Sequence, residues 1–295
     1  PTIDQNLVQS LCHLLDSMHD IFCAKDEEGN ALPLPEWLDD KKAYALIETS
    51  FLFALTWSIG ASVDLEGRDK FDEYLRNILS GKINEKVLNP KTLQEYDTGI
   101  PAGRKIQNPF PDKGSVYEYV PFVNEDACKW QPWTDRIDAK PQIDKDAKFA
   151  SVIVPTVDTA RYAYLLEILQ THDFPVLFVG PTGTGKSVYT MTKLANGFPE
   201  VYDNLVVTFS AQTSANQTQD IIDGKLDKRR KGIFGPPLGK KMIIFVDDLN
   251  MPMVEEYGAQ PPIEILRQYM DHEGWYDRKE TSFRRLVDIQ FVAAM

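Results

Sequence analysis

The feature that most constrains the fold is a glycine-rich turn, FVGPTGTGKSVYT, between an apolar run and a stretch that suits a helix. Gly180, Gly185, Lys186 and Ser187 match the pattern G-x-x-x-x-G-K-[ST]. In this pattern the N–H groups of residues 183–188 surround a phosphate, the lysine bridges the β- and γ-phosphates, and the hydroxyl ligates Mg²⁺. We therefore expect bound ATP or ADP with Mg²⁺. The predicted nucleotide-binding residues of this turn are Gly180, Pro181, Thr182, Gly183, Thr184, Gly185, Lys186, Ser187 and Val188.

Short apolar runs alternate with helix-compatible segments after Ser151. The runs are β-branched or aromatic, as buried parallel strands are, and they cover residues 175–179, 205–209, 242–246 and 288–295. The intervening segments suit crossover helices, at residues 186–195, 213–230 and 261–272. The predicted fold class is α/β, a doubly wound parallel sheet of the P-loop NTPase kind flanked by helices, which places the glycine turn between a strand and a helix.

The run at residues 242–246 delivers two carboxylates to the sheet edge where ligands bind in open α/β folds. We expect Asp247 to hold Mg²⁺ through water, together with Ser187. Asp248 is the predicted catalytic residue, which polarises the attacking water. Related ATPases usually place Glu there, and the shorter reach of Asp by about an ångström can lower the rate on the order of a hundredfold. Solvated loop charge is the alternative explanation of the two acids.

Two further segments carry weaker signals. In VIVPTVDTARY, Val154 and Pro155 follow an apolar strand and precede a Thr or Asp cap, so they offer a wall and a backbone edge for an adenine ring. Residues 225–241 form a local basic run, for which a solvated helix end followed by a turn is favoured over a binding surface.

The first part of the chain predicts helices. Apolar residues recur at helical spacing over residues 6–22, and again near residues 71–78. A helix over residues 41–59 has Tyr44, Ile47, Phe51 and Leu55 on one side. Residues 1–95 are therefore predicted to be a small all-helical subdomain.

Residues 96–150 are rich in Pro, Gly and charge, and are predicted to be a connecting segment. Its stretch SVYEYVPF alternates well enough to be an edge strand. Trp130 and Trp133 are expected to plug a groove between domains rather than to stack on bases. The segment from residue 151 to residue 295 is then the nucleotide-binding part.

Bulk properties exclude several classes of protein. The formal net charge of −12 argues against nucleic-acid binding, which needs clustered Lys and Arg. Three cysteines without a CxxC pair argue against zinc or a disulfide framework and favour a reducing compartment. The apolar stretch at residues 51–63 is shorter than the roughly 20 residues of a membrane span, so a core helix and no membrane partner are expected. Because the chain ends inside an apolar run, it is expected to be a piece of a longer protein.

The glycine turn, the stretch FSAQTSANQTQDIIDGKLDKRRKGIFGPPLGKKMIIFVDDLNMP and the stretch YGAQPPIEILRQYMDH closely resemble the third AAA+ module of axonemal dynein heavy chains. FLFALTWSIGASVDLEGRDKFDEYLR resembles the end of the helical subdomain of the second module. The resemblance covers nearly the whole chain in the expected order, and it is nearest to the inner-arm type.

This resemblance implies a ring motor of six AAA+ modules that hydrolyses ATP and moves along microtubules in the axoneme of cilia, in the cytoplasm and cytoskeleton. It makes Gly180–Ser187 the Walker A loop, Asp247 and Asp248 the Walker B acids, and Val154 with Pro155 the adenine side. The implied partners are neighbouring AAA+ modules, and, through regions outside this sequence, microtubules and dynein intermediate and light chains.

The resemblance implies a regulatory nucleotide site rather than the main engine. The alternative is a permanently loaded structural module that does not hydrolyse ATP. Sensor, lid and arginine-finger residues fall outside this sequence, so the isolated piece is expected to be inactive or very slow, since an arginine finger is worth about 10³ to 10⁵ in rate. A free-standing P-loop kinase or transporter ATPase would need an acceptor-substrate site or an ABC signature, and the sequence contains neither LSGGQ nor a lid of clustered arginines.

Overall fold

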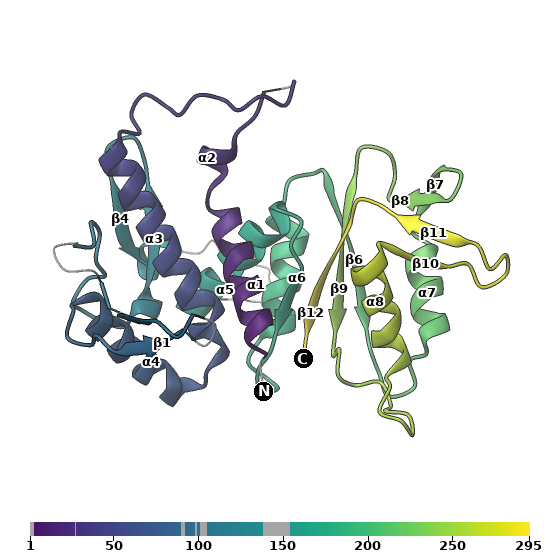
Figure 1. Cartoon of the computed structure of the whole chain (residues 1–295). Coiled ribbons are helices and arrows are strands. Elements are labelled where there is room, and N and C mark those ends of the chain that lie inside the picture. The colour runs from purple at the N-terminus through teal and green to yellow at the C-terminus, as the bar shows by residue number, and fades with distance from the viewer. Residues whose placement is uncertain (1–2, 27, 90–91, 98, 101–104, 138–153) are drawn as a thin grey trace. The chain divides into compact units, whose positions relative to one another are not determined.

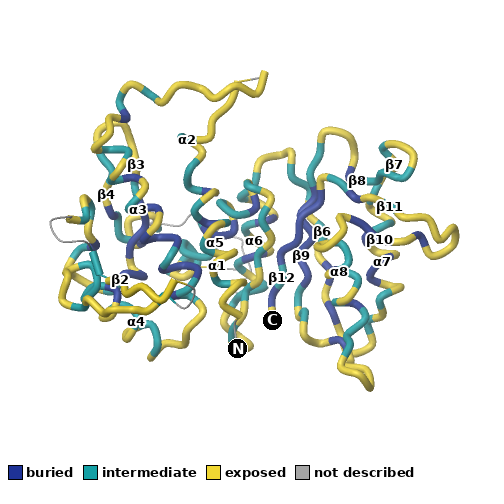
Figure 2. The backbone as a smooth tube through the Cα atoms, in the orientation of Figure 1, coloured by how far each residue is buried: buried dark blue, intermediate teal, exposed yellow. Residues whose placement is uncertain are grey.

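The structure, a computed structural model, describes residues 3–26, 28–89, 92–97, 99–100, 105–137 and 154–295. The chain divides into two compact units, Pro1–Ala160 and Arg161–Met295. Buried apolar residues occur in both, and Figure 2 shows buried stretches of the backbone in each. Each unit therefore has a core of its own.

The first unit begins with helices, as predicted. Their bounds are α1 Asp4–Ser17, α2 Asp20–Cys23, α3 Asp40–Ser58 and α4 Leu65–Leu79. Asp39 caps α3 by accepting a hydrogen bond from the N–H of Lys42, and Asp64 caps α4 through the N–H of Gly67. The helix expected over residues 6–22 is interrupted between α1 and α2, and α1 packs against α3.

Helix α3 is apolar on more than one side. Its buried side includes Leu46, Phe53 and Trp57, whereas Tyr44 and Ile47 are 59% and 43% exposed. The side predicted to carry Tyr44, Ile47, Phe51 and Leu55 is the more exposed one, because the buried residues lie elsewhere around the helix. By length and composition alone, residues Asp40–Ser62 could cross a membrane, but 56% of that stretch is buried inside the protein. Packing in the core accounts for its apolar character.

Two antiparallel strand pairs follow the helices of the first unit. Strand β1 (Lys86–Leu88) pairs with β2 (Glu95–Asp97), and β3 (Tyr119–Val123) pairs with β4 (Cys128–Pro132). The strand predicted in SVYEYVPF is thus present. The prediction that residues 1–95 are all helical is wrong at their end, because β1 and the first residue of β2 lie there.

The two tryptophans lie within the first unit. Trp133 is fully buried, with its ring centroid 6.3 Å from that of Phe53 and 6.2 Å from that of Trp57. Trp130 stacks on Phe110 at 4.1 Å and donates a hydrogen bond to the carbonyl of Asn108. They fill a core rather than a groove between domains, so described parts of the predicted connecting segment belong to this core. Residues 98, 101–104 and 138–150 of that segment lie outside the described residues.

The second unit is built on a parallel sheet (Figure 1). Its strands are β5 Val176–Phe178, β6 Tyr202–Thr208, β9 Lys241–Asp247 and β12 Ile289–Ala294. The spatial order is β5-β12-β9-β6, and all three pairings are parallel. Each of the four predicted strands is confirmed.

Helices cover both faces of this sheet. Leu166 of α5 and Leu194 of α6 pack with Ile243, Phe245 and Val292. On the opposite face, Ile222 of α7 and Leu266 of α8 pack with Ile244, Val246 and Phe291. Consecutive residues of β9 thus serve two different cores, which gives the buried central strands in Figure 2. The helix bounds are α5 Val157–Thr171, α6 Lys186–Asn196, α7 Ala215–Asp223 and α8 Pro261–His272. The doubly wound prediction is confirmed.

A second four-stranded sheet was not predicted. Its order is β10-β11-β8-β7, with bounds Gly274–Tyr276, Phe283–Leu286, Ile233–Gly235 and Asp227–Arg230. The helix expected over residues 213–230 is wrong in its last part, because α7 ends at Asp223. The basic run is a strand pair that turns at Gly232, where φ is +77°, rather than a helix end.

Candidate nucleotide site

The glycine loop joins β5 to α6. Gly183 and Gly185 have φ of +81° and +86°, values that L side chains rarely adopt. A Cβ added at Gly185 would also lie 2.7 Å from the ring of Tyr189, whereas one added at Gly183 would meet nothing within 4 Å. At residue 185, both the left-handed backbone and the nearby Tyr189 ring disfavour a side chain. At residue 183 only the backbone does, because that glycine faces open space.

The loop leaves its N–H groups available. Within the described chain, the N–H groups of residues 183–188 donate no hydrogen bond, and the first intrahelical bond runs from Tyr189 N to Gly185 O at 2.9 Å. Val188 is in the first turn of α6 and is exposed, as is Thr182 in the loop. Unsatisfied N–H groups at the start of a helix attract anions, because they carry the positive end of the helix dipole.

Lys186 holds the loop together from inside. Its Nζ donates to the carbonyls of Gly180 and Pro181, both at 2.7 Å, and lies 3.3 Å from Thr184 Oγ1. The hydroxyl of Thr184 in turn donates to Pro181 O at 3.0 Å. Gly180 N donates to the carbonyl of Met295, at the end of β12. The ammonium group therefore links the carbonyls at the start of the loop to the Thr184 hydroxyl near its end.

Ser187 and Asp247 meet at the carboxyl edge of the sheet. Ser187 Oγ donates to Asp247 Oδ1 at 2.8 Å, and the N–H of Asp248 donates to the same oxygen at 3.1 Å. Within the described residues Asp247 Oδ2 accepts no hydrogen bond. A hydroxyl and a carboxylate side by side are oxygen ligands of the kind Mg²⁺ prefers, so the residues present fit this ion. No cluster of three Cys, His, Asp or Glu side chains occurs in the described ranges, so water and phosphate would complete the coordination.

Asp248 differs from its neighbour. Its side chain is exposed, and its φ of +55° puts the backbone in the left-handed region. Asp and Asn tolerate this region better than other L residues, which is a physical reason for Asp at this position. Its carbonyl accepts a hydrogen bond from Met251 N at 2.9 Å, so the strand turns sharply directly after Asp247.

The residues predicted for the adenine side precede α5. Val154 is 60% exposed, and Pro155 is partly exposed. The cap predicted there is present, since Thr156 and Thr159 exchange hydrogen bonds between side chain and backbone N–H, each at 3.2 Å. Of the apolar strand expected before Pro155, residues 152–153 are outside the described part. The role of Val154 and Pro155 stays a prediction.

The structure brings together the glycine loop, Ser187 and Asp247, as predicted from the sequence. It adds one residue that the sequence did not indicate, Tyr189, whose ring packs on Gly185. An aromatic residue four positions after a glycine that opens a helix is the signal that was available.

Comparisons with known proteins agree with this architecture. Residues 141–295 match the family model described as the P-loop containing dynein motor region, and residues 1–135 match the dynein heavy chain AAA lid domain. The chain is 49% identical to dynein axonemal heavy chain 12 of Mus musculus over 84% of its length, and 45% identical to dynein axonemal heavy chain 1 of Homo sapiens over 98%. It is 41% identical to dynein axonemal heavy chain 3 of Homo sapiens over 98%. The matched regions span only 8%, 6% and 7% of those proteins. With both halves matched by dynein family models, the chain belongs to the dynein heavy chain family.

Proposed function

We propose that the second unit binds Mg-ATP or Mg-ADP at the glycine loop and acts as a regulatory nucleotide module of an axonemal dynein heavy chain. The observation that carries this proposal is the set of N–H groups of residues 183–188, which donate no hydrogen bond in the described chain and belong to the same loop as the Lys186 ammonium. Free N–H donors together with a cation suit the β- and γ-phosphates of a nucleotide.

Each residue of the site has a separate task in this proposal. The Lys186 ammonium exchanges the carbonyls of Gly180 and Pro181 for phosphate oxygens. Ser187 Oγ and Asp247 hold the metal side of the nucleotide, Ser187 directly and Asp247 through water. When bound, Mg²⁺ would supply neutralisation of the phosphate charge. The adenine side is assigned to Val154 and Pro155 by the family resemblance alone.

Asp248 decides between a switch and a static module. It is the carboxylate nearest in sequence to Asp247, and we assign to it the polarisation of the attacking water. Its exposed side chain and left-handed backbone support slow turnover, because a short, exposed acid is poorly pre-organised. The same observation favours the second candidate function, a permanently loaded structural module without hydrolysis.

The role of the whole protein is part of the proposal, because the chain spans less than a tenth of the relatives it matches. Those relatives are named axonemal dynein heavy chains. We propose an ATPase motor that moves along microtubules in the ciliary axoneme, within the cytoplasm and cytoskeleton. Residues 1–95 and 151–295 would belong to its second and third AAA+ modules, and the inner-arm type is our assignment.

The proposed partners follow from the same family. They are neighbouring AAA+ modules of the heavy chain, with microtubules and intermediate and light chains bound by other regions. Neither nucleic acid nor membrane is a proposed partner, in keeping with the net charge of −12. The isolated 295-residue piece is expected to hydrolyse ATP very slowly or not at all.

The test is the identity of the nucleotide in this site of the full-length heavy chain. With the other nucleotide sites emptied by mutation, acid-released nucleotide is separated by chromatography. We expect one equivalent of ADP, since slow turnover at Asp248 followed by retention leaves the product in place.

The control variant is Lys186→Ala, which removes the ammonium and is expected to release the nucleotide. Intact ATP in the unsubstituted protein would favour the static module over the switch. An empty site, or an equal amount of nucleotide in Lys186→Ala, would overturn the assignment of this loop as the binding site.

A further inference from the structure

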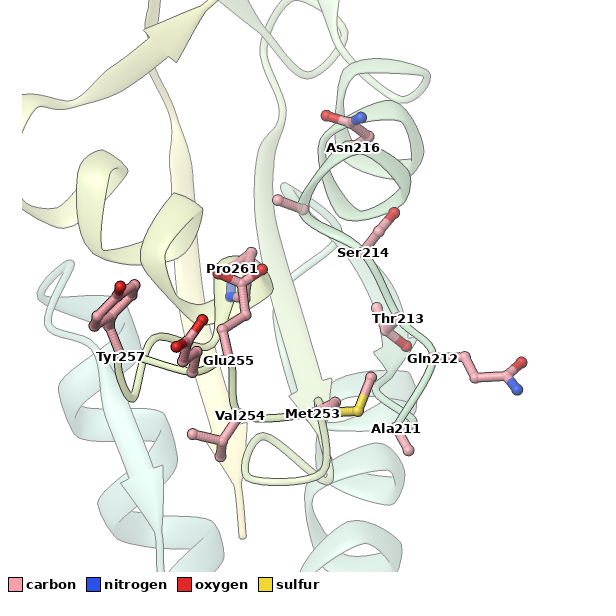
Figure 3. A pocket seen from close by; sticks show the side chains of 12 residues that line it. Ala211, Gln212, Thr213, Ser214, Asn216, Met253, Val254, Glu255, Tyr257 and Pro261 are labelled. Atoms are coloured by element: carbon pink, nitrogen blue, oxygen red, sulfur yellow. The ribbon is translucent and has the colours of Figure 1, made fainter.

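A groove lies apart from the glycine loop on the second unit. It is an open groove of about 890 Å³ between residues 211–216, which include the first residues of α7, and residues 253–257, which precede α8. Figure 3 shows Met253 beside Ala211, with Glu255 and Tyr257 on the opposite side from Ser214 and Asn216. The two walls are joined by a hydrogen bond of 3.3 Å from Met253 N to Ala211 O.

The loop that forms one wall exposes large apolar side chains. Tyr257 is 93% exposed, Met253 72% and Val254 59%. Backbone bonds hold the loop in shape, from Glu255 N to Ala259 O at 2.8 Å and from Gly258 N to Glu255 O at 2.9 Å. Since exposing these side chains to water opposes the hydrophobic effect, an ordered loop that presents them is typical of a binding surface.

The charge at the groove is negative. Glu255 and Glu256 both line it, and neither forms an ion pair with any residue in the described ranges. A tyrosine ring beside two carboxylates suits Lys or Arg, through cation–π contact and ion pairing, and methionine adapts to apolar side chains of varied shape.

We propose that this groove docks a segment of the same heavy chain from outside these 295 residues, and that the segment combines apolar side chains with Lys or Arg. The complementary charge selects a basic segment. The source rests on the proposed function: the chain spans less than a tenth of its relatives, and in a full-length heavy chain the rest of the polypeptide would be tethered to this surface at high effective concentration. The docking is separate from nucleotide binding at the glycine loop.

Photo-crosslinking in the full-length heavy chain tests this docking. The photoreactive residue p-benzoylphenylalanine replaces Tyr257, and the crosslinked peptides are identified by mass spectrometry. A matched probe replaces Leu238, which is 87% exposed on the same unit but does not line the groove. We expect the probe at residue 257 to capture one peptide of the heavy chain that contains Lys or Arg and apolar residues and lies outside residues 1–295, and the probe at residue 238 not to capture that peptide.

Charge reversal supplies the second measurement. The double variant Glu255→Lys and Glu256→Lys, made with the probe at residue 257, should lower the crosslink yield roughly fivefold. Glu280→Lys, an exposed acid outside the groove, should leave the yield unchanged. A crosslink to a different polypeptide, a crosslink within residues 1–295, no crosslink, or a yield insensitive to the double reversal would overturn the proposal. Because the yield is measured independently of bound nucleotide, its failure would leave the nucleotide site untouched.

Discussion

The glycine loop and the loop after β9 leave the same parallel sheet, but their functional groups are held differently. In the glycine loop, Lys186 and Ser187 are bound to groups of the protein itself. In the loop of residues 248–260 the backbone is bonded, whereas Asp248, Met253 and Tyr257 project outward. The polar groups of the glycine loop are therefore bonded within the loop or to the adjacent strand, whereas the loop of residues 248–260 exposes its side chains to solvent.

The difference shows where each loop obtains its binding energy. Free backbone N–H groups and an ammonium group in one loop suit a small anion, because both kinds of group donate hydrogen bonds to it. Exposed aromatic and thioether side chains suit a polypeptide, because their contact area is realised only when another surface covers them. Neighbouring parts of one unit can thus serve two kinds of ligand, and matched substitutions in the two loops test that distinction.

The largest expected effect comes from glycine substitution. Gly185→Ala introduces a Cβ 2.7 Å from the Tyr189 ring at a φ of +86°, so the glycine loop must distort. We expect nucleotide affinity in the full-length protein to fall by about a hundredfold or more, because misplaced donors no longer converge on the phosphate. Binding of a fluorescent ADP analogue measures this change.

The matched control is Gly258→Ala in the other loop. Its φ is +83°, but the added Cβ would meet nothing within 4 Å. Only the left-handed backbone is strained, at about 1–2 kcal/mol, so nucleotide affinity should stay within about twofold of the parent. Equal losses in both variants would show that the glycine loop has no special role.

The second prediction separates the two adjacent acids. Asp247→Asn removes the carboxylate charge next to Ser187, and we expect the Mg²⁺-dependent gain in nucleotide affinity to fall by about 10- to 100-fold, the worth of one charged hydrogen bond to the metal shell. Asp248→Asn alters an exposed group, so this gain should change by less than about threefold while hydrolysis stops. Titrations with Mg²⁺ and with excess EDTA measure both. A larger loss of Mg²⁺ dependence in Asp248→Asn would reverse the roles.

Local sequence was sufficient to predict the parallel sheet and most of the site. Strands such as β9 are continuous apolar runs, and the glycine loop carries its chemistry within eight consecutive residues. The second sheet was missed because β7 is short and basic, and because Leu226 continues the helical register of Ile222 past the true end of α7. Gly224, at the helix C-cap, was the competing signal.

Other features depend on tertiary structure. The left-handed backbone of Asp248 results from the turn closed by Met251 N. The groove is formed by loops about 40 residues apart in sequence, so no local pattern contains it. Helix α3 is apolar on both sides, so the periodicity of its sequence does not show which side is buried. The buried side is set by packing in the first unit, where β3 and β4 contact the helix.

The smallest expected effect comes from the exposed aromatic ring. Tyr257 is 93% exposed, so Tyr257→Ser should change the free energy of unfolding of the 295-residue chain by no more than about 0.5 kcal/mol. Tyr269→Ser is the matched control, since Tyr269 packs on Trp275 and Phe291 and donates to Ile289 O at 2.7 Å. Burial raises the pKa of Tyr269, so its hydroxyl stays a donor, and its loss should destabilise the chain by about 3 kcal/mol. Urea unfolding measures both variants. If Tyr257→Ser lost 2 kcal/mol or more, on the order of a core truncation, the Tyr257 ring would be packed within the chain. The contrast between the glycine loop and the loop of residues 248–260 would then fail.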